Sequence, residues 1–247
     1  MINPMELTGK HILITGGSSG IGRECAIQAS RLGARVTLIA RSRDNLMETI
    51  EAMENSEKHA CYDFDLSKTN EIETLIKTVV VRQGRVDGFC HAAGIGDLRP
   101  LKQCKPAFVE KMLRIHIYAF VELIRALSLK DYLRDGASLV GISSVAAERG
   151  NLAQGVYAAA KAGINGFLQP AARELAPRGI RVNAVSYAMV DTDMFRQLVN
   201  TEEKAELIER QFYGVIDVES AANAVMFLLS NACKYITGSV FPVYAGY

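Results

Sequence analysis

A glycine-rich segment near the start of the chain, residues 15–22 (TGGSSGIG), constrains the fold more than any other feature of the sequence. It follows an apolar run at 11–14 and precedes a stretch with the periodicity of a helix. Gly16, Gly20 and Gly22 permit a tight turn, so that backbone N–H groups at the start of the helix can approach an anion. Many glycine clusters are merely flexible turns, but the order strand, turn, helix is typical of a dinucleotide-binding site.

The composition bounds the number of domains and the kind of partner. A chain of 247 residues that is 49% hydrophobic can bury one sizeable core, and we expect a single domain over residues 1–247. Its 28 basic and 27 acidic residues leave a net charge of +1, which disfavours nucleic acid and anionic membranes as partners. We therefore expect a small-molecule partner.

Cysteine usage and the first residues bear on the compartment. The five cysteines are widely spaced and lack a CxxC pair, which argues against a disulfide framework and against a zinc site, and we expect no metal. The first residues lack the basic and apolar segments of a secretory signal, and no apolar run is long enough to span a bilayer. We expect a cytoplasmic protein.

Short apolar runs alternate with long amphipathic stretches along the chain. This alternation predicts a Rossmann-type, doubly wound α/β fold with one sheet of about seven parallel strands and helices on both faces. We predict strands at 11–15, 35–40, 59–64, 87–91, 137–143, 180–185 and 238–243. We predict helices at 20–32, 44–55, 69–83, 105–133, 154–176, 193–210 and 218–230. Residues 188–213 would overhang the carboxyl ends of the strands, either as a substrate lid or as a plain connecting helix pair.

Ser144, Tyr157 and Lys161 form a second informative set. Tyr157 and Lys161 are four residues apart in a predicted helix and share one face, while Ser144 follows the fifth predicted strand. A phenol has a pKa near 10, so acting as an acid near neutral pH requires about 4 kcal/mol, for a shift of about three units. An ammonium about 4 Å away supplies about that much. Each residue alone has an ordinary structural role, but together they predict a catalytic proton donor.

Over nearly its whole length the chain resembles the classical short-chain dehydrogenase/reductase family, and in particular the 3-oxoacyl-carrier-protein reductases. Besides the glycine turn and the three residues above, the matching segments are 65–66 (DL), 92–94 (AAG), 181–185 (RVNAV) and 192–194 (TDM). The resemblance implies an oxidoreductase that transfers a hydride between a nicotinamide cofactor and a carbonyl or secondary alcohol. Tyr157 would be the general acid and base, Ser144 would steady the substrate oxygen, and Lys161 would hold the ribose and lower the tyrosine pKa.

The same resemblance implies a set of cofactor-binding residues. Asp65 would contact the adenine, residues 93–94 the adenosine ribose, and Thr192 the carboxamide. Ordinary roles as helix caps or loop residues stay open for these positions. The full expected set is Gly16, Ser18, Ser19, Gly20, Ile21, Gly22, Arg41, Ser42, Asp65, Leu66, Ala93, Gly94, Tyr157, Lys161, Val190 and Thr192.

Residues 39–43 (IARSR), after the second predicted strand, bear on the choice of cofactor. An acidic residue here would bind the ribose 2′-hydroxyl of NAD and repel a 2′-phosphate, and none is present. Arg41 offers a planar donor fork, with the Ser42 hydroxyl beside it, which suits a phosphate. We therefore predict NADP(H), although arginines at this place can also simply solvate the start of a helix.

Four places depart from the family pattern, and one of them is near the C-terminus, where residues 244–246 (YAG) replace an Asp-Gly-Gly. His116, which we include among the catalytic residues, stands where the family usually has an asparagine that holds a water of a proton relay. It either relays protons itself or only fills the pocket. His91 and Ala92 replace two amides, and Tyr187 and Ala188 replace a Pro-Gly pair.

The sequence thus predicts an NADP(H)-dependent short-chain dehydrogenase/reductase acting on CH–OH and C=O groups. The alternative function is that of a non-catalytic NADP(H)-binding regulatory or scaffold protein, which His116 and the missing Pro-Gly pair favour. By resemblance we also expect a homodimer or homotetramer paired through the predicted helices at 105–133 and 154–176. Mild support comes from the apolar residues Ile115, Ile117, Phe120, Leu123 and Leu127.

Overall fold

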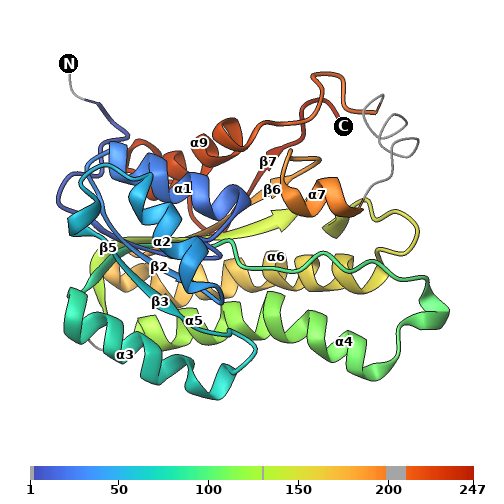
Figure 1. Cartoon of the computed structure of the whole chain (residues 1–247), viewed down its shortest axis with the longest axis horizontal. Helices are drawn as coiled ribbons and strands as arrows, with labels where there is room; N and C mark the ends of the chain where they lie inside the picture. The colour runs from blue at the N-terminus through green and yellow to red at the C-terminus, as the bar shows by residue number, and fades with distance from the viewer. Residues whose placement is uncertain (1–2, 130, 199–209) are drawn as a thin grey trace.

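The computed structural model describes residues 3–129, 131–198 and 210–247, which form a parallel sheet with helices on both faces (Figure 1). Seven strands lie in the order β3-β2-β1-β4-β5-β6-β7. The predicted α/β fold is confirmed, and each predicted strand overlaps an observed one. The strands are β1 His11–Thr15, β2 Arg35–Ala40, β3 Ala60–Asp63, β4 Val86–His91, β5 Leu133–Ser144, β6 Arg181–Tyr187 and β7 Val240–Val243.

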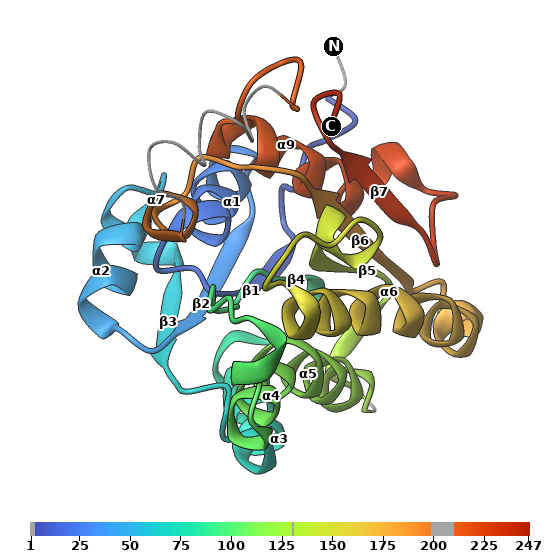
Figure 2. The same cartoon turned by 90° about the vertical axis from the view of Figure 1, so that its right-hand side faces the viewer.

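Two helical layers cover the sheet. Side chains alternate along each strand, so that Ile12 and Ile14 of β1 enter one core and Leu13 enters the other. Helices α1, α2 and α9 pack on the first face, and α3, α5 and α6 pack on the second (Figure 2). The helices are α1 Gly20–Arg31, α2 Arg43–Glu51, α3 Ile72–Gln83, α4 Pro106–Leu113, α5 Ala119–Ser128, α6 Gly155–Leu175, α7 Asp193–Leu198 and α9 Val218–Leu229.

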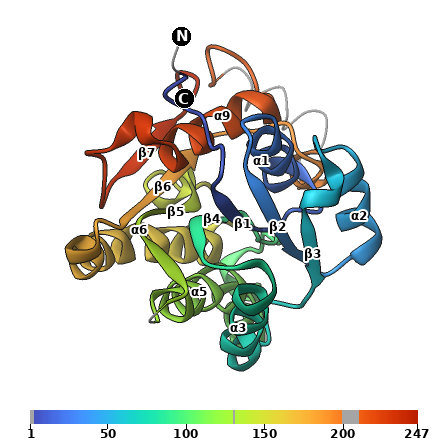
Figure 3. The same cartoon turned by 90° about the vertical axis from the view of Figure 1, so that its left-hand side faces the viewer.

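The strand order reverses beside β1. The chain runs from β1 outward to β3 and then returns to β4 on the other side of β1, as the view along the sheet in Figure 3 shows. Parallel α/β sheets bind ligands outside the carboxyl ends of the strands at such a reversal. A ligand site is therefore expected at the loops that follow β1 and β4. None of the helices in the described parts of the chain is long and apolar enough to cross a membrane.

The predicted helix at 105–133 is confirmed over residues 106–128 and is wrong only at its end, where the helix stops at Ser128. The segment consists of α4, a π-helical turn at Arg114–Tyr118 and α5, and β5 already begins at Leu133. Leu133, the first residue of β5, is buried and pairs with Val86, but the next three residues, 134–136 (RDG), are exposed, unlike a buried strand. Of the predicted helix at 193–210, α7 occupies the first part, and residues 199–209 lie outside the described residues.

The apolar residues that suggested a pairing surface mostly serve this chain's own core. Phe120, Leu123 and Leu127 are completely buried in the core beneath the sheet. Ile117 is partly buried against the same core. These residues therefore give no support to oligomerisation.

Candidate active site

The glycine turn joins β1 to α1 where the strand order reverses. Gly16 and Gly20 have φ angles of +72° and +51°, which L side chains rarely adopt. A Cβ on Gly16 would lie 2.7 Å from the backbone nitrogen of Ala93. Ser19 precedes α1 and makes no capping bond with its side chain, so the first N–H groups of the helix are left for another acceptor. This cradle suits an anion.

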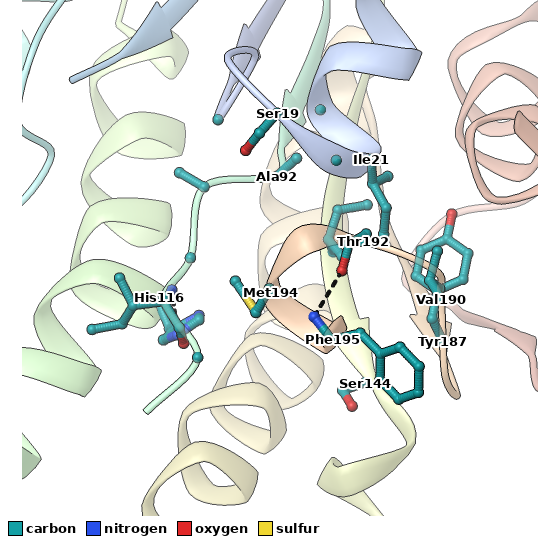
Figure 4. Close-up of a pocket in the computed structure, with 18 of the residues that line it drawn as sticks. Ser19, Ile21, Ala92, His116, Ser144, Tyr187, Val190, Thr192, Met194 and Phe195 are labelled. Atoms are coloured by element: carbon teal, nitrogen blue, oxygen red, sulfur yellow. Dashed lines mark hydrogen bonds between the residues drawn. The ribbon is translucent and has the colours of Figure 1, made fainter. Parts of the chain in front are cut away.

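A cavity of about 790 Å³ opens beside this turn at the carboxyl edge of the sheet. Segments that follow all seven strands contribute to its wall, and Figure 4 shows the part that carries Ser19, His116, Ser144 and Thr192. Every residue that the sequence assigns to catalysis or to the cofactor lines it: Gly16, Ser18, Ser19, Gly20, Ile21, Gly22, Arg41, Ser42, Asp65, Leu66, Ala93, Gly94, His116, Ser144, Tyr157, Lys161, Val190 and Thr192. The fold thus brings together residues from the whole length of the chain.

Arg41 and Ser42 lie at one end of the cavity, and both are exposed. The neighbouring Arg43 is paired with Asp63 at 3.1 Å, whereas Arg41 forms no ion pair with any residue of the described ranges. The pKa of Asp65 is lowered mainly by a backbone N–H bond and further by the charge of Arg41. Arg41 is therefore the guanidinium available at this end.

Ser144, Tyr157 and Lys161 meet near the middle of the sheet edge. Ser144 ends β5 and accepts a hydrogen bond of 3.2 Å from the backbone N–H of Ala146. Tyr157 and Lys161 lie one turn apart in α6. Burial raises the pKa of Tyr157, and the side chain of Ser144 partly opposes this rise.

Lys161 is only 5% exposed, and its environment differs from the sequence-based expectation. Its Nζ donates a hydrogen bond of 2.7 Å to the carbonyl oxygen of Ile142 and lies 5.6 Å from the centroid of the Tyr157 ring. Burial lowers the pKa of Lys161 to about 7. The expectation that Lys161 makes the phenol acidic is therefore not met in this structure, because desolvation dominates for both groups.

His116 belongs to the π-helical turn and is buried against Tyr157. Its Nε2 lies 3.0 Å from the carbonyl oxygen and 3.3 Å from the nitrogen of Ile95. Burial, and next the charge of Lys161, lower the pKa of His116 well below its ordinary value. Its Nδ1 has no partner among the residues that the structure describes. A neutral imidazole therefore borders the proposed proton donor.

Of the other residues that depart from the family pattern, His91 and Tyr187 are also buried. His91 Nδ1 lies 2.9 Å from the hydroxyl of Thr15, so it links the ends of β4 and β1. Tyr187 lines the cavity, and its hydroxyl donates a hydrogen bond of 2.6 Å to the carbonyl oxygen of Ala221 in α9. Tyr187 therefore links the end of β6 to α9, a contact that a Pro-Gly pair could not make.

Sequence reasoning missed several residues that line the same cavity. They belong to the loops after β4 and β5 and to the segment after β7, and they are Leu98, Asn151, Gln154 and Tyr247. No spacing in the sequence indicates them, because only the folded chain brings these segments to one place. The backbone N–H of Phe195 donates to the Thr192 hydroxyl at 3.2 Å (Figure 4).

Comparison with known proteins agrees with this arrangement. The family described as enoyl-(acyl carrier protein) reductase matches residues 16–247. A 3-oxoacyl-(acyl-carrier-protein) reductase FabG of Pseudomonas aeruginosa is 32% identical over 245 residues, 98% of each chain. Carbonyl reductase family member 4 of Danio rerio is 31% identical over 234 residues, which is 95% of this chain and 96% of that protein.

Solved structures give the same result. A dehydrogenase/reductase from Sinorhizobium meliloti superposes with a TM-score of 0.91 at 29% identity, over 98% of this chain and 96% of that one. The fold, the order of the matching segments and the relatives all agree. The chain belongs to the short-chain dehydrogenase/reductase family of oxidoreductases.

Proposed function

We propose that the protein is an NADP(H)-dependent oxidoreductase that interconverts a ketone and a secondary alcohol, with Tyr157 exchanging the proton. The observation that carries this proposal is that Ser144, Tyr157 and Lys161 line the same cavity as the glycine turn. The names of the relatives, a 3-oxoacyl reductase and a carbonyl reductase, support a carbonyl substrate. A single domain over residues 1–247, a cytoplasmic location and a homodimer or homotetramer remain predictions of the sequence.

The residues present fit a nicotinamide dinucleotide. The cradle at Gly16 and the uncapped start of α1 would hold the pyrophosphate, because a side chain at Gly16 would collide with the backbone of Ala93. Arg41, with Ser42 beside it, would hold a 2′-phosphate, which is the basis for preferring NADP(H). When bound, the nicotinamide supplies or accepts the hydride.

The chain's own residues would control the proton. The raised pKa of Tyr157 keeps its phenol protonated, so that it can donate to the substrate oxygen in the reducing direction. Ser144 would donate a hydrogen bond to the same oxygen and hold the carbonyl in place. A protonated Lys161 would stabilise the phenolate that remains. Positioned proton transfer of this kind contributes about 10² to 10⁴ in rate.

The test is NADPH oxidation with a panel of ketones that includes acyl thioesters. We expect turnover by the unaltered protein and a loss of at least about 100-fold in Tyr157→Phe, with NADPH affinity nearly unchanged. A Tyr157→Phe protein as active as the parent would rule out the mechanism. Tight NADPH binding without turnover of any carbonyl would instead favour the non-catalytic regulator that the departures at His116 and Tyr187 suggest.

A further inference from the structure

Three chain segments join to form a rim at the part of the cavity near Tyr157. The backbone N–H of Arg99, in the loop after β4, donates a hydrogen bond of 3.0 Å to the carbonyl oxygen of Ala153 in the loop before α6. The second loop in turn holds Tyr247. Asn151 Nδ2 donates to the Tyr247 hydroxyl at 3.3 Å, and Arg149 Nη1 donates to the Tyr247 carbonyl oxygen at 3.1 Å.

Residues 244–247, which we name the tail segment, are also fixed on their other side. The hydroxyl of Tyr244 lies 3.0 Å from that of Ser186 in β6. The backbone N–H of Tyr213 donates to the carbonyl oxygen of Ala245 at 3.0 Å. A Cβ on Gly246 would lie 2.8 Å from the ring of Phe212. The tail segment is therefore held on both sides by contacts with the rest of the chain, and its last residue, Tyr247, lines the cavity.

The rim also contains strained backbone. Among the described residues, four that are not glycine have a positive φ: Asn55, Asp131, Ala153 and Ala245. Ala153 and Ala245 belong to the rim, with φ angles of 62° and 50°. Such conformations persist only where surrounding contacts fix them, and they gather at ligand-binding sites.

Two hydrogen-bond donors of the rim are left without a partner. Gln154 Oε1 accepts a bond of 2.9 Å from the backbone N–H of Asn151, but its amide NH₂ donates to no residue in the described ranges. The Tyr247 hydroxyl accepts from Asn151, and its own hydrogen likewise donates to none of them. Both side chains line the cavity. The rim therefore presents donors to whatever enters.

We propose that Gln154 and Tyr247 select substrates that carry a second, neutral acceptor oxygen, such as an ester, amide or thioester carbonyl, beyond the reacting ketone. Gln154 lies three residues before Tyr157 at the start of α6, and residues three apart on a helix have Cβ atoms about 5–6 Å apart. The second oxygen would therefore lie within a few bonds of the first. Leu98 and Phe195 give the cavity an apolar surface for the rest of the substrate. This inference rests on the proposed function.

The test compares two ketones of equal chain length, ethyl 3-oxobutanoate and 2-heptanone, of which only the first has the extra oxygens. The measured quantity is the ratio of their kcat/KM values, so that intrinsic reactivity cancels between variants. Tyr247→Phe removes one donor. Gln154→Glu removes the other but keeps the oxygen that Asn151 needs. Tyr235→Phe is the matched control, because Tyr235 is 91% exposed and does not line the cavity.

We expect Tyr247→Phe and Gln154→Glu each to lower the ratio by about three- to tenfold, the effect of one hydrogen bond, while Tyr235→Phe leaves it unchanged. Unchanged melting temperature and NADPH affinity in Tyr247→Phe would show that the fold is intact. If the unaltered protein reduces both ketones and neither rim variant changes the ratio, the inference fails and the proposed function stands. If the unaltered protein turns over other carbonyls of the panel but neither of these ketones, the inference fails and the proposed function stands. If it turns over no carbonyl of the panel, both fail.

Discussion

The imidazole of His116 stands edge-on to the phenol of Tyr157, with ring centroids 5.5 Å apart and an interplanar angle of 88°. Because burial keeps the pKa of His116 well below its ordinary value, the imidazole is neutral wherever the protein is folded at moderate pH. From its contacts with Tyr157 and Ile95 we propose that His116 positions the phenol and does not relay protons. These contacts favour the second of the two roles that the sequence left open.

We expect His116→Asn to lower kcat by about two- to tenfold, because an edge-to-face aromatic contact contributes about 0.5–1.5 kcal/mol. The shape of the pH profile of kcat/KM between about pH 5 and about pH 8 should stay the same, since this histidine does not titrate there. The measurement is steady-state kinetics across that range. If the pH profile of the unaltered protein shows a titration near the ordinary histidine pKa, and this titration is absent in His116→Asn, then His116 relays protons.

Gly94 should not tolerate a side chain. A Cβ there would lie 2.6 Å from Cε1 of His116, whose ring is buried and bound to Ile95. We expect Gly94→Ala to lower the free energy of unfolding by about 1–3 kcal/mol and to weaken NADPH binding. The matched control is Gly166→Ala in α6, where a Cβ meets nothing within 4 Å. That variant should be more stable by about 0.5–1 kcal/mol. Urea unfolding of both variants checks the pair, and equal effects would contradict the steric argument.

Arg41 and Arg43 allow a matched test of cofactor choice. Only Arg41 lines the cavity, whereas Arg43 is paired with Asp63. We expect Arg41→Gln to raise KM for NADPH by about 10- to 100-fold, the effect of a hydrogen bond to a charged group, with little change in KM for NADH. Arg43→Gln should leave both constants nearly unchanged. Equal changes for NADPH and NADH in Arg41→Gln would remove the assignment of NADP(H).

Lys161 should destabilise the folded protein at low pH. Burial lowers the pKa of Lys161 from 10.5 to about 7, so between these values the unfolded chain binds more protons than the folded one. The contribution of this group to stability therefore rises with pH through that window and is most unfavourable below about pH 7. We expect Lys161→Met to be inactive but more stable than the parent near about pH 6, by at least about 1 kcal/mol.

This advantage of Lys161→Met should shrink by about 2 kcal/mol near about pH 9, since the parent then carries a neutral lysine when folded. Urea unfolding at the two pH values measures it. The control is Lys77→Met, which makes the same substitution at a lysine of another helix, α3. A stability difference between Lys161→Met and the parent that does not vary with pH would show that Lys161 keeps its proton in the folded state.

Local patterns in the sequence were sufficient for the strands and for most of the candidate site. Apolar runs predicted β1 and β4, and the glycine turn together with the spacing of Tyr157 and Lys161 predicted residues that line the cavity. These signals are local, because each depends on a few neighbouring residues. The start of β5 could not be predicted, since residues 134–136 are exposed and lie in an irregular stretch between Leu133 and Ser138, which both pair with β4.

Electrostatics and distant contacts could not be predicted in the same way. The bond from Lys161 to Ile142 and the pKa of the lysine depend on burial, which the sequence does not specify. The contact of Tyr247 with Asn151 joins residues 96 positions apart, and no pattern indicates it. What the sequence predicts well is therefore which residues border the cavity, and what it predicts poorly is how they are charged and paired.

The π-helical turn at Arg114–Tyr118 is wider than an α-helical turn, and Ile115 and His116, adjacent in sequence, both line the cavity. A π-helical turn closes over one residue more than an α-helical turn within about the same rotation. Deleting one residue here would therefore restore ordinary helical winding and leave Phe120 and Leu123 of α5 facing the sheet. The loss would fall on the cavity wall, where the extra residue lets both Ile115 and His116 contribute.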